Sequence, residues 1–159
     1  MVGDGLHNFD FLHGNWRMEH RRMVGRLVGS TSWQAFDGTC RCIPTMAGAG
    51  NIDDVVVNLP EGSYRAMALR SFDKVSGLWA IWWLDGRSPH GLDVPVIGGF
   101  RNGVGEFLAD DILNGSPIGV RFQWSLTDQG VPHWEQAFSP DGGVTWEVNW
   151  VNEFFPLAE

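Results

Sequence analysis

The chain is poor in cysteine, tyrosine and charge, and it has no long apolar run. Of its 159 residues, two are cysteine and one is tyrosine, and the four charged residue types together make up 19%. The longest uninterrupted apolar stretch, residues 78–84, is far too short to span a bilayer. A chain of this length can bury a sufficient core without disulfide or metal staples. We therefore expect one domain, residues 1–159, with no membrane span.

The two cysteines, Cys40 and Cys42, do not suggest a disulfide or a metal site. They lie two positions apart on a probable strand, where pairing with each other is geometrically poor. The residues around them supply no cluster of further zinc ligands. The N-terminus has neither the basic start nor the apolar core of a secretion signal. The sequence therefore favours two buried thiols in a reducing cytoplasm.

The charge balance and the missing motifs exclude several function classes. A formal net charge of −8, with no local cluster of Lys and Arg, disfavours binding to nucleic acid or to an anionic membrane. The glycine-rich stretch 98–105 is not followed by a helical pattern, so a phosphate-binding loop is not expected there. No Gly-x-Ser-x-Gly elbow, Walker motif or His-Glu-x-x-His zinc site occurs.

Tryptophan, phenylalanine and glycine are abundant, at 9, 10 and 21 residues. Short segments that alternate apolar and polar residues, separated by turn residues, follow one another from Trp16 to Phe155. Such strands have one apolar face each, and they bury these faces by closing on one another. The expected strands are 16–24, 32–36, 40–46, 53–59, 63–72, 78–85, 95–101, 105–113, 118–126, 133–139 and 145–155, of which the second and third could be one bent strand.

The connections favour a meander. Asn102-Gly103 and Asn114-Gly115 are signals for two-residue hairpins, and proline precedes glycine in 60–62 and 140–143, as in tight turns. Short connections make sequence neighbours spatial neighbours, and no long crossover is visible. We predict an all-β fold, an antiparallel up-and-down barrel of about ten strands that follows a short helical turn at residues 6–12.

Two motifs carry a resemblance to a known superfamily. Phe9-Asp10-Phe11-Leu12-His13-Gly14-Asn15-Trp16 resembles the opening motif of lipocalin-like (calycin) barrels. Within these it is similar to an uncharacterised bacterial calycin-like family, which also resembles the chain over Ser139-Pro140-Asp141-Gly142-Gly143-Val144-Thr145-Trp146. The resemblance implies a small barrel with an internal cavity, floored by Trp16. It implies no activity, since none is assigned to that family.

Polar residues in phase with the aromatic ones are the candidates for a cavity site, because alternate residues of a strand share a face. The candidates for acid–base chemistry are His20, on the face of Trp16, and Asp54, on the face of Ile52 and Val56. The candidates for ligand binding are Arg22, Arg70, Trp82, Trp124, Gln136, Trp150 and Asn152. No metal ligands are predicted.

Three functions fit this pattern. The first is a barrel that binds a small, mostly apolar or aromatic molecule in its cavity. The second is a cofactor-independent isomerase, cyclase, hydratase or lyase. In that enzyme His20 would act as acid and base, Arg22 or Arg70 would anchor the substrate or stabilise an oxyanion, and Asp54 would orient or accept a proton. The third is a packed barrel without a cavity. Haem ligation by one of the five histidines is a further alternative, although no resident cofactor is expected.

The segment 78–84 also suggests self-association. It is apolar on both faces, whereas a single barrel needs one. If Trp82 faces inward, Trp79, Ile81 and Trp83 form an outward ridge, and such patches mark interfaces. A symmetric homodimer would cover the ridge. The alternative is that the segment around Phe9 and Phe11 folds over it.

Overall fold

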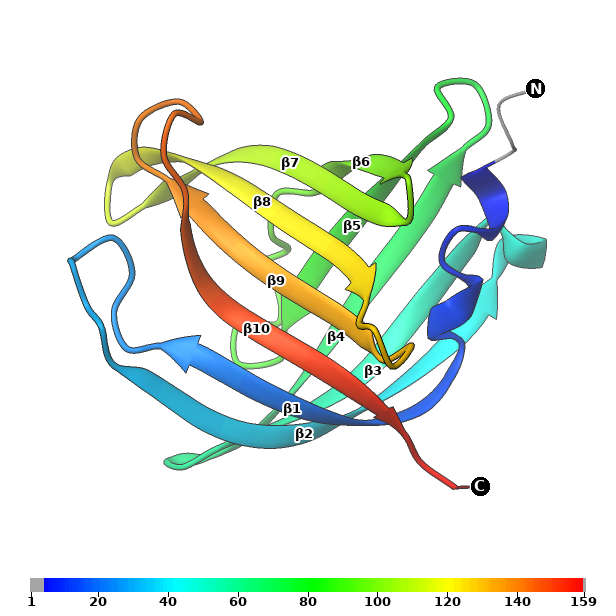
Figure 1. The fold of residues 1–159 in the computed structure, drawn as a ribbon, viewed down its shortest axis with the longest axis horizontal. Coiled ribbons are helices and arrows are strands. Elements are labelled where there is room, and N and C mark those ends of the chain that lie inside the picture. Colours follow the sequence, from blue (N-terminus) through cyan, green and yellow to red (C-terminus); the bar gives the residue numbers. More distant parts are fainter. Residues whose placement is uncertain (1–4, 159) are drawn as a thin grey trace.

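The computed structural model describes residues 5–158, which form a closed antiparallel barrel of ten strands (Figure 1). Each strand is hydrogen-bonded to its neighbours in sequence, and the first strand closes the barrel against the last. The strands are β1 (Gly14–Met23), β2 (Trp33–Thr45), β3 (Gly50–Leu59), β4 (Gly62–Asp73), β5 (Leu78–Asp85), β6 (Val96–Arg101), β7 (Val104–Leu113), β8 (Ser116–Leu126), β9 (Pro132–Ser139) and β10 (Glu147–Pro156). The predicted fold class is confirmed, and the expected strands 32–36 and 40–46 belong to one continuous strand, β2.

Local turn chemistry sets the meander. Asn102 and Gly103, between β6 and β7, have φ angles of 52° and 79°, and Asn114 and Gly115, between β7 and β8, have 50° and 81°. Positive φ at both central residues is the mark of the two-residue turn whose twist matches the strands. These hairpins were expected from the sequence, and they make the order of the strands follow the order of the chain.

Hydrogen bonds within the β9–β10 connection explain the second motif. The Asp141 carboxylate accepts hydrogen bonds from the Thr145 amide and hydroxyl, at 2.8 and 2.5 Å. The Ser139 hydroxyl oxygen accepts one from the Gly143 amide, at 2.8 Å. Trp146 then packs against Gly119 of β8, on the outside of the barrel. The motif therefore has a structural role as a self-capped loop.

The N-terminal segment closes one end of the barrel, and Figure 1 shows the segment beside that end. It contains two short 3₁₀ turns, η1 (Gly5–His7) and η2 (Asp10–Leu12), while a third, η3 (Met46–Gly48), connects β2 to β3. Phe9 and Leu12 are fully buried. The Trp16 indole N–H donates to the Leu12 carbonyl at 2.7 Å, so Trp16 lies at this closed end, as expected. None of the helical segments within residues 5–158 could cross a bilayer.

The orientation expected for β5 is wrong. Trp79 and Ile81 point into the barrel and are 2% and 4% exposed, whereas Trp82 points outward. The physical reason is the closed end, where the Phe9 ring meets the Trp79 ring edge-on at 5.1 Å. The Trp79 indole N–H also donates to the Gly5 carbonyl, at 2.9 Å. The outward ridge of Trp79, Ile81 and Trp83 therefore does not exist.

A different apolar row lies on the outer face of the sheet. Trp82 pairs with Leu69 of β4, Leu69 with Ile52 of β3, and Ile52 with Ile43 of β2. Ile43 and Leu69 are 41% and 38% exposed. The homodimer stays a prediction, and this outer apolar row replaces the ridge from which we had inferred it.

Candidate functional site

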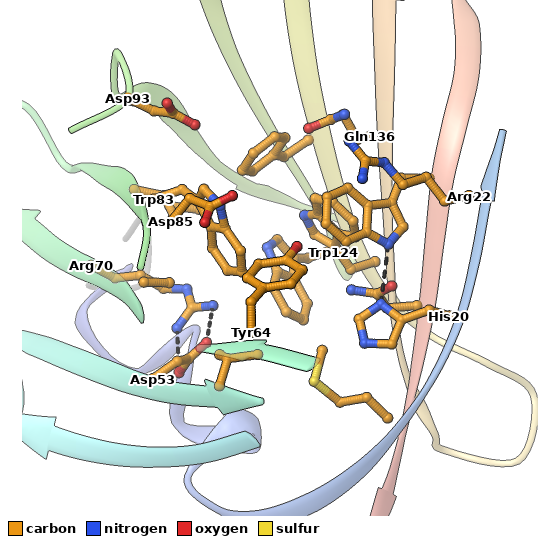
Figure 2. A pocket seen from close by; sticks show the side chains of 18 of the residues that line it. His20, Arg22, Asp53, Tyr64, Arg70, Trp83, Asp85, Asp93, Trp124 and Gln136 are labelled. Carbon is orange, nitrogen blue, oxygen red and sulfur yellow. Dashed lines mark hydrogen bonds and ion pairs between the residues drawn. The ribbon is translucent and has the colours of Figure 1, made fainter. Parts of the chain in front are cut away.

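The barrel encloses a cavity of about 370 Å³, whose lining side chains are drawn in Figure 2. The cavity opens at the end opposite the N-terminal segment. Its mouth is formed by residues of the loops that follow β1 and β5, including Arg26 and Ser88. Its apolar walls consist of Met18, Val55, Tyr64, Ala68, Ile81, Trp83, Leu113, Phe122, Trp124, Trp134, Phe138, Trp150 and Phe154. The volume is at the lower end of the range for small-molecule sites, and an aromatic box with few polar groups is their usual form.

A buried ion pair forms the floor of the cavity. The Arg70 guanidinium donates from Nη1 to Asp53 Oδ1 at 2.9 Å and from Nη2 to Asp53 Oδ2 at 2.7 Å. Nη1 also donates to Asn51 Oδ1, at 2.8 Å. The guanidinium carbon lies 5.2 Å from the ring centres of both Phe9 and Trp124. Arg70 therefore lies inside, as predicted, but its charge is already balanced by Asp53.

The orientation expected for Asp54 is wrong. Asp53 faces the interior and is 3% exposed, whereas the Asp54 carboxylate lies outside, 2.7 Å from Arg65 Nη2. The stretch from Ile52 to Val57 places apolar residues on both faces and one aspartate on each, so alternation alone cannot choose between the two phases. The interior Arg70 on the adjacent strand makes the choice, because a buried guanidinium requires a carboxylate partner.

His20 is a neutral, buried side chain in the wall of the cavity. The Trp150 indole N–H donates to His20 Nδ1 at 3.1 Å, so Nδ1 is the unprotonated nitrogen of the ring. Nε2 is buried next to Gly38, and the ring stacks on Phe36 at 4.8 Å. Burial lowers the pKa of His20 to about 4. A neutral ring whose lone pair is occupied is poorly suited to accept a proton from a ligand.

Arg22 lies one inward-facing position nearer the mouth than His20. Its guanidinium carbon is 4.6 Å from the centre of the Trp150 ring. Burial lowers the pKa of Arg22, and the neighbouring Arg26 acts in the same direction. No carboxylate among residues 5–158 lies within ion-pair distance of Arg22. In contrast to Arg70, this side chain brings an unbalanced charge to the cavity.

Most of the residues predicted for the site come together in the cavity. His20, Arg22, Arg70, Trp124, Gln136, Trp150 and Asn152 line it, whereas Trp82 and Asp54 do not. Figure 2 shows that Arg22 and Gln136 both reach into it. Sequence reasoning missed Tyr64 and Trp134, although each is in phase with a predicted residue of its own strand, Arg70 on β4 and Gln136 on β9. It also missed Trp83 and Asp85, because the phase of β5 was inverted.

The described residues do not favour a metal or haem site. Residues 5–158 contain no group of three or more His, Cys, Asp or Glu side chains that could hold a metal ion. Of the histidines, only His20 lines the cavity, and its Nδ1 already accepts the Trp150 hydrogen bond. Haem iron is held by such a nitrogen lone pair. The haem alternative would require that hydrogen bond to break.

The two cysteines are free and buried within the described chain. Both lie on the inner face of β2 beside Asp53, and Cys42 is paired with Asp53 in the strand register. Burial raises the thiol pKa of each, and the charge of Asp53 adds to the effect. The thiols are therefore protonated and unreactive at neutral pH. The cytoplasmic location stays a prediction.

The comparisons with known proteins add no family assignment. The chain matches no known family model, and no curated protein is significantly similar to it. The closed ten-stranded antiparallel architecture is consistent with a calycin-like barrel. Fold and cavity thus define the class of protein, a hollow antiparallel barrel, and its function has to be argued from the cavity.

Proposed function

We propose that the protein binds a small, mostly apolar or aromatic molecule inside the barrel. The observation that carries this proposal is the open cavity of about 370 Å³ with aromatic walls. A protein whose barrel served only as a packed module would fill this space, because interiors normally contain few voids larger than a water molecule. Aromatic rings offer a planar ligand edge-to-face and stacked contacts on several sides.

Binding is favoured over the alternative of an isomerase, cyclase, hydratase or lyase. That enzyme was expected to use His20 as acid and base with Asp54 as its partner. His20 has a pKa of about 4 because of burial, and its Nδ1 is occupied by Trp150. Asp54 is on the outer face, paired with Arg65. The two residues do not meet, so the acid–base pair on which the enzyme hypothesis depended is not assembled.

The proposal can be tested by filling the cavity. Ala68 lies on its wall and is 4% exposed, and Ala68→Phe would occupy the space of a ligand. The matched control is Ala35→Phe, at an exposed position on the outer face of β2. The probe is N-phenyl-1-naphthylamine, a neutral aromatic dye whose fluorescence rises in apolar sites.

We expect the wild type and Ala35→Phe to bind the dye equally, and Ala68→Phe to bind it at least tenfold more weakly. Near-UV circular dichroism would establish that each variant keeps its packed core. Dye binding that is the same in all three folded proteins, or absent from the wild type, would contradict the proposal.

A further inference from the structure

The charged side chains that line the cavity are not all paired with one another. Asp53 balances Arg70 on the floor. At the mouth, Asp85 binds Arg87, with 2.7 Å between Oδ2 and Nη2. Within the described chain, this leaves three charged lining residues without an ion-pair partner, which are Arg22, Arg26 and Asp93.

Asp93 is the one carboxylate among these three residues, against two arginines. Burial raises its pKa, and the charges of Asp111 and Asp85 raise it further. Burial lowers the pKa of Arg22, and the charges of Arg26 and Arg87 act in the same direction, whereas Tyr64 and Asp85 act to raise it. An arginine nevertheless stays protonated near neutral pH. Since Arg87 is paired with Asp85, two unpaired guanidinium groups face one unpaired carboxylate among the described lining residues, so the mouth of an otherwise acidic protein carries an excess of positive charge.

The aromatic wall holds Arg22 in place without neutralising it. Its guanidinium lies over the Trp150 ring, and its Nε is buried with no hydrogen-bond partner. Trp150 is itself oriented by the hydrogen bond from its indole N–H to His20 Nδ1. The His20 ring is stacked on Phe36. In this arrangement His20 is a positioning residue, since only its neutral form can accept the Trp150 hydrogen bond.

We propose that the ligand is an organic anion, with an oxyanion head group that binds Arg22 and an apolar or aromatic body that occupies the cavity. This inference rests on the proposed binding function. A partly buried charge without a partner costs free energy, and an oxyanion on the guanidinium removes that cost. The fork of the guanidinium suits a carboxylate or sulfonate, which it can bind through two hydrogen bonds. Arg26 adds attraction at the mouth, and the body extends towards Trp124 and Ile81.

The experiment compares two dyes that share an aromatic body and differ in charge. 8-Anilino-1-naphthalenesulfonate carries a sulfonate, and N-phenyl-1-naphthylamine is its neutral counterpart. Both are titrated against the wild type, Arg22→Met and Arg21→Met. Arg21 is the adjacent residue on β1 and is exposed on the outer face, so its variant removes the same charge from outside the barrel. The ratio of the two dissociation constants is compared between proteins, because any general change in cavity shape cancels in this ratio.

We expect Arg22→Met to weaken sulfonate dye binding about tenfold to a hundredfold, as for a lost charge-assisted hydrogen bond. The neutral dye should change less than threefold, and Arg21→Met should bind both dyes as the wild type does. Arg22→Lys, which keeps the charge but loses the fork, should fall in between. If Arg22→Met binds the sulfonate dye within threefold of the wild type, the anion proposal is wrong.

The outcomes for the two proposals can be told apart. Suppose that Ala68→Phe abolishes binding of the neutral dye but Arg22→Met leaves the sulfonate dye unaffected. Cavity binding then stands, and only the anionic nature of the ligand is rejected. If neither dye binds the wild type, or if Ala68→Phe weakens neither, both proposals fail.

Discussion

Arg70 and Asp53 form a two-point ion pair at the floor of the barrel, with N–O distances of 2.9 and 2.7 Å and side chains that are 3% and 5% exposed. Burial acts to lower the pKa of Arg70, but the charge of Asp53 and its hydrogen bonds raise it more, so the net change is upward. The pairing keeps the buried Arg70 guanidinium in its charged form. It also explains why Arg70, although it lines the cavity, is less available to a ligand than Arg22.

The first prediction concerns this pair. Asp53→Asn leaves the buried guanidinium uncompensated and should lower the free energy of unfolding by about 3–5 kcal/mol. The double variant Asp53→Asn with Arg70→Met should recover part of this loss, because it removes the unpaired charge. The control is Asp54→Asn, whose partner Arg65 is exposed, and which should cost at most about 1 kcal/mol. Urea unfolding measures all three, and equal losses at positions 53 and 54 would be the contrary result.

The second prediction is a pH dependence due to His20. Its pKa falls from 6.5 to about 4 in the folded protein because of burial. Between these values the unfolded chain binds a proton that the native state excludes. The free energy of unfolding therefore has its full value, as far as His20 is concerned, above pH 6.5. It declines by about 3 kcal/mol as the pH falls to about 4. Unfolding of the wild type and of His20→Gln at intervals over this range should show the decline only in the wild type. Parallel profiles would contradict the assignment.

The third prediction concerns the close approach of β6 and β7. A Cβ atom at Gly98 would overlap the carbonyl oxygen of Glu106, whereas one at Gly99 would meet only Leu78 Cδ2, at 3.7 Å. Gly98→Ala should therefore lower the free energy of unfolding by about 1–3 kcal/mol through strain. Gly99→Ala is the control and should have a small effect. Thermal unfolding compares them, and a Gly98→Ala variant as stable as the control would be inconsistent with this packing.

The fourth prediction is the homodimer. The outer apolar row of Ile43, Ile52, Leu69 and Trp82 crosses four adjacent strands, and contiguous apolar surface of this kind favours association. Light scattering at micromolar concentration should give twice the monomer mass of 17.7 kDa. Leu69→Lys, in the middle of the row, should shift the mass towards the monomer. A wild-type monomer would mean that the row is ordinary exposed surface.

Much of the cavity could be predicted where a strand is clearly amphipathic. On β1, Trp16, Met18 and His20 alternate with the more exposed Arg17 and Glu19, and the predicted face is the inner one. The faces of Gln136 on β9 and of Trp150 on β10 were likewise predicted correctly. On β3 and β5 both faces carry apolar residues, and there the choice of face was wrong for Asp54 and Trp82. Alternation decides orientation only when the two faces differ.

The sequence by itself determined the architecture, because its signals are local. Asn-Gly turns and alternating strands act over a few residues, and they dictate a meander whose apolar faces must close on themselves. Only the tertiary structure decided which charges are balanced. Arg22 and Arg70 look alike in the sequence, yet Arg70 meets Asp53 from the neighbouring strand. Arg22 lies on a tryptophan, and no carboxylate of residues 5–158 is within ion-pair distance of it. That difference depends on which side chains converge across the barrel, and no pattern along one strand contains it.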